Sequence, residues 1–425
     1  MGGRSNQSLG TEMATKRRFL GALLGGGLAG LLALATAPAL AAEPVFIGLD
    51  AEFGHSTSTS AQAVQQGIQI ALDEVNAAGG VLGGRKIELR ISDNRSITAV
   101  GVDNFREMAA VKDLIAVFGG KFSPIYTETL PLAHELQLPL MDPWASADQI
   151  TDHSFRPNYV FRLSLKDAWA APAFMRFAQQ QHQAQRVAFL LPNTVWGRSN
   201  KAALDKAAGD AGIKVVGERW YNWGDKSLIA RYQELRAAGA QALILVANEV
   251  EGALLVKEIA ALPPEQRLPL ISHWGVTGGD FARMTGDALD QVDFSVVQTF
   301  SFLHPQTPRT KQLVAALKTR YGVASAEAIK SPVGVAQAYD LTHLLVQALQ
   351  QAGSTERPKI RNALEKLPPW QGAIGRYAQP FSPTRHDALS ANHVFFARYT
   401  AQDVLLPIAP SAQAVPAKPT QPVKR

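Results

Sequence analysis

Cysteine is absent from this chain of 425 residues. Its absence excludes disulfide bonds, thiolate metal sites, a cysteine nucleophile and a lipid-modified cysteine anchor. It does not decide the cellular compartment of the protein, because many exported proteins fold without disulfides.

Recognisable catalytic and metal-binding motifs are also lacking. The nine histidines are spread from His55 to His393 without metal-ligand spacing. No G-x-S-x-G nucleophile motif occurs, and Arg85 stands where a glycine-rich phosphate loop needs lysine. The sequence therefore predicts that the chain is not an enzyme and needs no metal or cofactor.

A strong charge of one sign is lacking too. The net charge is +6, and about half of it comes from residues 1–41, where basic residues outnumber the single acid Glu12. This bias is too weak to indicate a nucleic-acid partner.

The N-terminus has the pattern of an export signal. The basic residues 16–18 precede an uncharged, apolar run over 19–37, and residues 39–41 read Ala-Leu-Ala. This order is typical of a cleaved secretory signal peptide, so we expect cleavage after Ala41 and a periplasmic mature protein. A retained membrane helix is the alternative, since the apolar run is long enough to be arguable. The route, general or twin-arginine secretion, stays open.

The rest of the chain alternates short β-rich runs with longer amphipathic runs. The expected strands are 45–49, 87–92, 114–119, 138–141, 159–163, 187–191, 215–220, 242–247 and 268–272, followed by 374–377 and 394–399. The expected helices are 61–75, 97–111, 127–135, 167–181, 197–211, 228–238, 250–261, 310–321, 333–351 and 359–367.

This alternation predicts an α/β protein whose parallel sheets carry helices on both faces. The number of units exceeds one ordinary sheet, so two doubly wound, Rossmann-like lobes are the natural division. Residues 407–425 are rich in proline, alanine and lysine and are expected to form a disordered tail.

Several motifs, in order along the chain, resemble those of type I periplasmic solute-binding proteins of the leucine/isoleucine/valine family. They are the glycine-rich turn 76–84 with 87–89 and Asp93; 118–120 with Ser123; Leu138-Pro139 with Asp142-Pro143; Phe161-Arg162 with Asp167; Val187-Ala188 with Trp196-Gly197; and Ala336 with 338–340. The resemblance covers about residues 45–399, and its specificity lies in the order and spacing of the motifs.

The resemblance implies two lobes joined by a hinge of three crossings. Lobe one would comprise 43–163 and 299–385, and lobe two 164–298 and 386–406. A small molecule would be held between the lobes, at the carboxyl ends of strands from both sheets. An ABC permease in the inner membrane would then be the protein partner.

The resemblance also implies the site residues. Ser123 and Ser146 match serines that hold a ligand carboxylate, and the backbone carbonyl of Trp144 matches one that helps to hold an α-ammonium group. Trp196 matches an aromatic residue of lobe two that packs on the ligand. Each serine has an alternative role as a helix cap, and each tryptophan as a core residue.

The remaining positions depart from the amino-acid-binding pattern. Trp274 stands where amino-acid binders often place an acid for the ammonium group, and Asn248 stands where some carry tyrosine. Glu249 and Glu251 flank Asn248 and are candidates to bring an acid into the site. His55, in the polar loop 52–60, is a further candidate whose alternative is an exposed loop residue.

These observations predict a binding protein for a small organic ligand, either amino-acid-like or an aromatic or otherwise apolar carboxylate. The missing acid at Trp274 argues against an ordinary aliphatic amino acid, because an unpaired ammonium group in a closed cleft is costly. Transport by an ABC importer is the leading hypothesis. A ligand-sensing periplasmic protein that signals to a receptor or regulator is the alternative.

Overall fold

The first of two large sheets is built entirely from parallel pairs. In the computed structural model, which describes residues 43–55, 58–304, 307–400 and 402–409, its order is β2-β1-β3-β4-β5. The strands are β1 (Val45–Ala51), β2 (Ile87–Asp93), β3 (Leu114–Gly119), β4 (Leu140–Asp142) and β5 (Val160–Arg162). Strands β1 and β3 are buried almost throughout, as expected of parallel strands that are covered on both faces.

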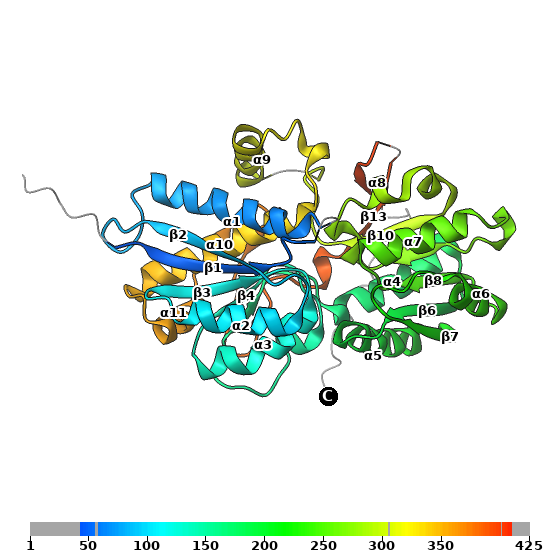
Figure 1. Cartoon of the computed structure of the whole chain (residues 1–425), viewed down its shortest axis with the longest axis horizontal. Helices are drawn as coiled ribbons and strands as arrows, with labels where there is room; N and C mark the ends of the chain where they lie inside the picture. Colours follow the sequence, from blue (N-terminus) through cyan, green and yellow to red (C-terminus); the bar gives the residue numbers. More distant parts are fainter. Residues whose placement is uncertain (1–42, 56–57, 305–306, 401, 410–425) are drawn as a thin grey trace, which may run out of the picture. The chain divides into compact units, whose positions relative to one another are not determined.

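Helices from both ends of the chain cover this sheet (Figure 1). They are α1 (Ser60–Ala77), α2 (Thr98–Ala109), α3 (Ser123–Glu135), α10 (Pro332–Ala352) and α11 (Arg357–Leu364). Helices α1 and α10 pack on each other, as do α2 and α3. Gly67 permits the first contact, because a Cβ atom there would lie 2.2 Å from the carbonyl oxygen of Val335.

The second sheet has the order β14-β13-β10-β9-β8-β6-β7. Its strands are β6 (Arg186–Pro192), β7 (Lys214–Tyr221), β8 (Ala242–Leu245), β9 (Leu270–Ser272), β10 (Phe294–Gln298), β13 (Phe395–Tyr399) and β14 (Leu405–Pro407). Strands β6 to β10 are parallel, whereas β13 and β14 add antiparallel pairs at one edge. The chain thus returns to this sheet after α10 and α11 have packed on the first.

The helices associated with the second sheet are α4 (Asp167–His182), α5 (Val195–Ala211), α6 (Ile229–Ala237), α7 (Glu249–Ala260) and the short α8 (Phe281–Thr285). Helix α4 packs on α5, and α7 packs on both α6 and α8. Helix α9 (Pro308–Tyr321) follows β10 and contacts α1. Strand β11 (Trp370–Gln371) pairs with β12 (Arg376–Tyr377) in a separate small hairpin.

The expected α/β alternation is confirmed, with several differences. Strand β14 was not predicted, and it includes Pro407, the first residue of the tail that was expected to be disordered. Strand β10 was not predicted, because no amphipathic helical run precedes its five residues in the sequence. Of the strand expected at 374–377, only the two residues of β12, Arg376–Tyr377, form a strand. The backbone N–H groups of Ala373 and Ile374 donate instead to the Asp340 carboxylate on α10, at 2.7 and 3.0 Å.

The predicted signal peptide, 1–41, lies outside the described residues, as does most of the predicted tail. The lobe boundaries stay a prediction. Among the residues that the structure describes, no helix is both long and apolar enough to cross a membrane.

Candidate functional site

One small pocket collects loops from the carboxyl ends of strands in both sheets. Six of the seven predicted site residues line it: Ser123, Trp144, Ser146, Trp196, Asn248 and Trp274. Lys121, Phe122, Pro124, Trp223 and Gly275 complete the lining. Parallel strands of one sheet end at the same edge, which brings these sequence-distant loops together. That they bind a ligand stays a prediction.

Ser123 begins α3 but does not cap it. Phe122 is the N-cap residue of α3, and no side chain caps this helix end. The Ser123 hydroxyl oxygen instead accepts a hydrogen bond from the backbone N–H of Ala147, at 3.3 Å. The capping alternative is therefore wrong for Ser123, and its oxygen ties the loop after β3 to the loop after β4.

Asp142 shapes the loop after β4. Its Oδ1 accepts hydrogen bonds from the backbone N–H groups of Trp144 and Ala145, at 3.0 and 2.7 Å. Complete burial raises the pKa of Asp142 to about 7, against the opposing effects of the Arg162 guanidinium and the two N–H donors. This carboxyl group therefore positions the Trp144 backbone at the edge of the pocket.

Ser146 links the two sheets directly. Its hydroxyl oxygen accepts a hydrogen bond from the indole N–H of Trp196, at 3.0 Å. Trp196 stands in the first turn of α5, which Thr194 caps by accepting from the backbone N–H of Gly197. The capping alternative is wrong for Ser146 as well, because its hydroxyl binds a side chain from the opposite wall.

Aromatic rings form most of the pocket walls. Trp144 and Trp274 come from different sheets, and their ring centroids lie 5.8 Å apart. Both are 1% exposed. Trp223, which follows β7, packs edge-on against Phe122 at 5.2 Å. The sequence reasoning missed Trp223, although its place just beyond an expected strand was a usable signal.

Behind the aromatic wall lies a buried histidine that was also missed. His273 Nε2 and Asp167 Oδ1 lie 3.1 Å apart, and both side chains are fully buried. The His273 ring packs edge-on against Trp196, with centroids 4.9 Å apart. Because Asp167 begins α4, this pair joins a crossing segment to the loop that carries Trp274 and supports the Trp196 ring.

A buried ion pair closes one end of the pocket. The Lys121 ammonium lies 2.9 and 2.7 Å from the two carboxylate oxygens of Glu249 and donates to the carbonyl of Gly278 at 3.3 Å. The Lys121 and Glu249 side chains are 2% and 1% exposed. Glu249, one of the two acids flagged from the sequence, thus reaches the loop of the first sheet.

The second flagged acid points elsewhere. Glu251 accepts a hydrogen bond from the backbone N–H of Gly224 at 3.0 Å, and burial raises its pKa. It does not line the pocket. Its contact fixes the loop that carries Trp223.

His55 is the predicted site residue that stands apart from the other six. It lies half-buried in the loop after β1, where its backbone N–H donates to the Glu52 carbonyl at 3.3 Å. It does not line the pocket. Its role as a ligand contact stays a prediction.

The walls of the pocket are in contact, so little space is left between them. The free volume is about 10 Å³, room for roughly one water molecule. A groove of about 830 Å³ adjoins the pocket, and Pro124 and Trp223 line both. The other groove residues are Thr98, Ala99, Val102, Asp103, Thr127, Glu128, Thr194, Val195 and Arg198.

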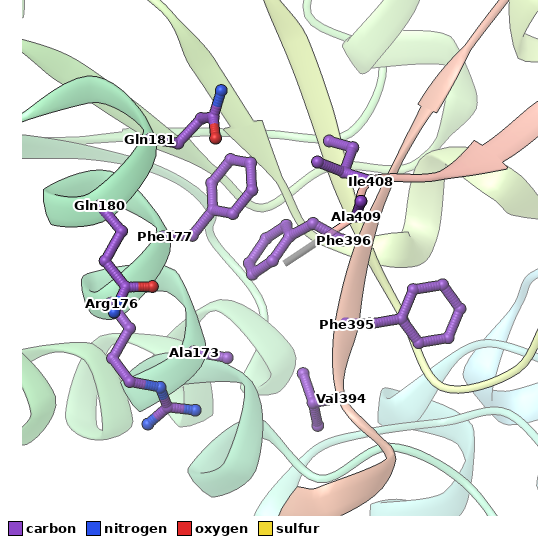
Figure 2. A pocket seen from close by; sticks show the side chains of 10 residues that line it. All are labelled: Ala173, Arg176, Phe177, Gln180, Gln181, Val394, Phe395, Phe396, Ile408 and Ala409. Atoms are coloured by element: carbon purple, nitrogen blue, oxygen red, sulfur yellow. The ribbon is translucent and has the colours of Figure 1, made fainter. Parts of the chain in front are cut away.

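A separate hollow of about 250 Å³ lies between α4, the strand β13 and the residues that follow β14. Figure 2 shows its lining, including the rings of Phe177 and Phe396, which stack with centroids 4.0 Å apart. It includes no predicted site residue. Among the described residues no cluster of three or more His, Asp or Glu side chains is arranged to hold a metal ion.

Comparison with known proteins places these features in context. The profile of a family described as periplasmic binding protein matches residues 44–401. A leucine-, isoleucine-, valine-, threonine- and alanine-binding protein of Pseudomonas aeruginosa is 24% identical over 328 residues, which are 76% of this chain and 83% of that protein.

Solved structures share the fold. A type 1 periplasmic binding protein from Bordetella pertussis aligns with a TM-score of 0.77 at 20% identity, over 86% of this chain and 99% of that one. A solute-binding protein of an ABC transporter from Rhodopseudomonas palustris, solved with 3,4-dihydroxybenzoic acid, aligns with a TM-score of 0.71 at 19% identity, over 86% and 96% of the two chains. The predicted fold class of two doubly wound lobes is confirmed.

Proposed function

The chain belongs to the periplasmic binding protein family, and from this premise we propose that it is the extracytoplasmic solute-binding component of an ABC importer. Its ligand is a small aromatic or otherwise apolar carboxylate, held between the two sheets. Its protein partner is an ABC permease in the inner membrane. Export depends on a signal peptide that ends at Ala41.

The lining of the interlobe pocket carries this proposal. It combines two serine hydroxyls, four tryptophan rings and one lysine, and no Asp or Glu belongs to it among the described residues. Indole rings suit a flat, apolar ligand. Hydroxyl groups and helix N-termini suit a carboxylate. A ligand ammonium group would meet no carboxylate in this lining.

The fold does not choose between ligand classes. A solved structure from Thermotoga maritima with the same fold is a leucine-binding protein, and the protein from Rhodopseudomonas palustris was solved with an aromatic acid. The ligand class is therefore argued from the side chains of this chain's own pocket.

Capture requires the two walls to separate. A benzoate-sized molecule is far larger than the present free volume of about 10 Å³, so the contacts between Trp196 and Ser146 and between Trp144 and Trp274 open on entry. A hinge motion between the two sheets does this at little cost to either core. The ligand then replaces these contacts and holds the lobes together.

Calorimetry with the purified mature protein tests the proposal. We expect benzoate, 4-hydroxybenzoate or 3-phenylpropionate to bind at least tenfold more tightly than leucine, isoleucine or valine. Tight leucine binding without aromatic-acid binding would contradict the ligand class. Uptake of a labelled ligand in cells with and without the gene then tests the importer role.

A further inference from the structure

Lys121 lies between the pocket and Glu249, an acid at the start of α7 that reaches across from the second sheet. Lys121 lines the pocket, whereas Glu249 does not. The carboxylate of Glu249 contacts the Lys121 ammonium through both oxygens. An incoming ligand therefore meets the lysine and not the acid.

The three ammonium hydrogens of Lys121 are all accounted for. A lysine ammonium has three donors, and the hydrogen bonds to Glu249 Oε1, Glu249 Oε2 and the Gly278 carbonyl use all three. All hydrogen-bond donors of the Lys121 ammonium group are thus used within the protein. The lysine neutralises Glu249 and offers a ligand no further ammonium donor in this arrangement.

We propose that Lys121 is the residue that sets the ligand class, by occupying with its own ammonium group the carboxylate that a ligand ammonium would otherwise bind. This inference rests on the proposed function, because it names what excludes amino acids from the same pocket. A ligand without an ammonium group enters beside an already neutral ion pair. An amino acid enters with a positive charge that has no partner.

The physical basis is the cost of unpaired charge in a buried site. Removing one partner of a buried pair leaves the other uncompensated and is strongly unfavourable. In Lys121→Met the Glu249 carboxylate lacks its partner, and it lies directly behind the shortened wall of the pocket. A primary amine that enters the pocket restores the pair, so the variant gains affinity for amines.

A purely structural role for the pair makes a different prediction. If Lys121 only joined the two sheets, Lys121→Met would lower stability and weaken every ligand alike. If Lys121 sets the ligand class, the same substitution changes selectivity in favour of ligands that carry an ammonium group. The selectivity ratio is therefore the informative readout.

The probes are a matched set on one ring: 3-phenylpropionate, with the carboxylate alone; phenylalanine, with carboxylate and ammonium; and phenethylamine, with the ammonium alone. For the wild-type mature protein we expect 3-phenylpropionate to bind at least tenfold more tightly than phenylalanine. For Lys121→Met we expect phenylalanine affinity to rise at least tenfold over wild type, and phenethylamine to raise the melting temperature where it leaves the wild type unchanged.

Two further variants separate the explanations. Lys121→Met combined with Glu249→Gln removes both charges, and we expect it to lose the gained amine binding. If Lys121→Met does not fold, Lys121→Gln keeps an N–H donor toward Glu249 but removes the positive charge that neutralises it, and we expect this variant to be stabilised by phenethylamine.

The outcomes distinguish the two proposals. Wild type that binds none of the aromatic acids contradicts the proposed ligand, while the phenethylamine measurement still tests Lys121. A folded Lys121→Met or Lys121→Gln variant that gains no amine binding overturns the role of Lys121. So does wild type that binds phenylalanine as tightly as 3-phenylpropionate, or a gain that persists in the doubly neutral variant.

Discussion

The indole N–H of Trp196, on α5 of the second sheet, donates a hydrogen bond to the hydroxyl of Ser146, in the loop after β4 of the first, at 3.0 Å. Both residues are buried and line the pocket between the two sets of loops. The bond orients the Ser146 hydroxyl across the pocket. Because the hydroxyl oxygen is the acceptor in this bond, its own hydrogen is the one that would be donated to a ligand carboxylate.

Ser146→Ala should weaken ligand binding through loss of that hydroxyl. A hydrogen bond to a charged group contributes about 1.5–3 kcal/mol, so the affinity for an aromatic carboxylate should fall roughly tenfold to a hundredfold by calorimetry. Ser199→Ala is the matched control. Ser199 is equally buried on α5 and accepts from the Asp148 backbone N–H at 3.0 Å, but it does not line the pocket. Equal losses in both variants would contradict a ligand contact at Ser146.

Trp274→Leu should lower affinity for aromatic ligands more than for aliphatic ones. The substitution removes one face of the Trp144–Trp274 pair, and aromatic pairing contributes about 0.5–1.5 kcal/mol beyond the area that it buries. We expect benzoate affinity to fall roughly two- to tenfold while a short aliphatic acid changes little. Trp220→Leu, on β7 and outside the pocket lining, is the control. A uniform loss for both ligands would argue against stacking.

The free energy of unfolding of Asp142→Asn, relative to that of the wild type, should increase as the pH rises. In the folded protein the pKa of Asp142 is raised to about 7, above its ordinary value of 3.8. Between these values the folded state holds the proton that the unfolded state has lost, so the contribution of this group to stability falls with rising pH. Asparagine keeps the Oδ1 acceptor for Trp144 and Ala145 but cannot ionise.

The measurement is urea unfolding of both proteins at pH 4 and pH 8. We expect the free energy of unfolding of Asp142→Asn, relative to wild type, to increase by about 1–4 kcal/mol over that interval. The exposed Asp103, which pairs with Arg106, provides the control variant Asp103→Asn. A relative stability of Asp142→Asn that is flat with pH would contradict the raised pKa.

Asp387→Asn should be strongly destabilising. Arg162 is fully buried, and its Nε lies 2.6 Å from Asp387 Oδ1. The two residues also form a parallel backbone bridge, which joins β5 to the segment around Asp387. Removing one partner of a buried pair costs about 3–5 kcal/mol.

An exposed ion pair provides the control for this loss of stability. Lys206 and Asp210 are more than half exposed and lie one turn apart on α5, so Asp210→Asn should change the free energy of unfolding by less than about 1 kcal/mol. Chemical unfolding of both variants gives the comparison. Similar small losses in both variants would show that the buried pair of Arg162 and Asp387 contributes little to stability.

Local pattern was enough to predict most of the elements. Helix α10 was expected at 333–351 and spans Pro332–Ala352, because its apolar face repeats with helical periodicity over many residues. Strand β10 has only five residues and little periodicity, and its pairing with β9 and β13 creates it. Short strands depend on their neighbours for hydrogen bonds, so their sequences signal them weakly.

The candidate site residues came from the resemblance to solute-binding proteins, and each of the six that line the pocket follows an expected strand. Ser123, Trp144, Ser146, Trp196, Asn248 and Trp274 meet because the carboxyl ends of parallel strands share an edge. Lys121 was not found, because a lone lysine beside glycines is indistinguishable in sequence from a solvated one. Its burial depends on Glu249, which is 128 residues away.

The amino-acid sequence by itself therefore determined the alternation of strands and helices, the two lobes and the strand ends at which a ligand would be bound, since these follow from local periodicity and chain direction. Only the tertiary structure decided which side chains pair across the pocket. Hydrogen bonds and ion pairs such as Trp196 with Ser146 and Lys121 with Glu249 form between segments whose separation in sequence carries no signal of contact. They depend on how the two sheets face each other.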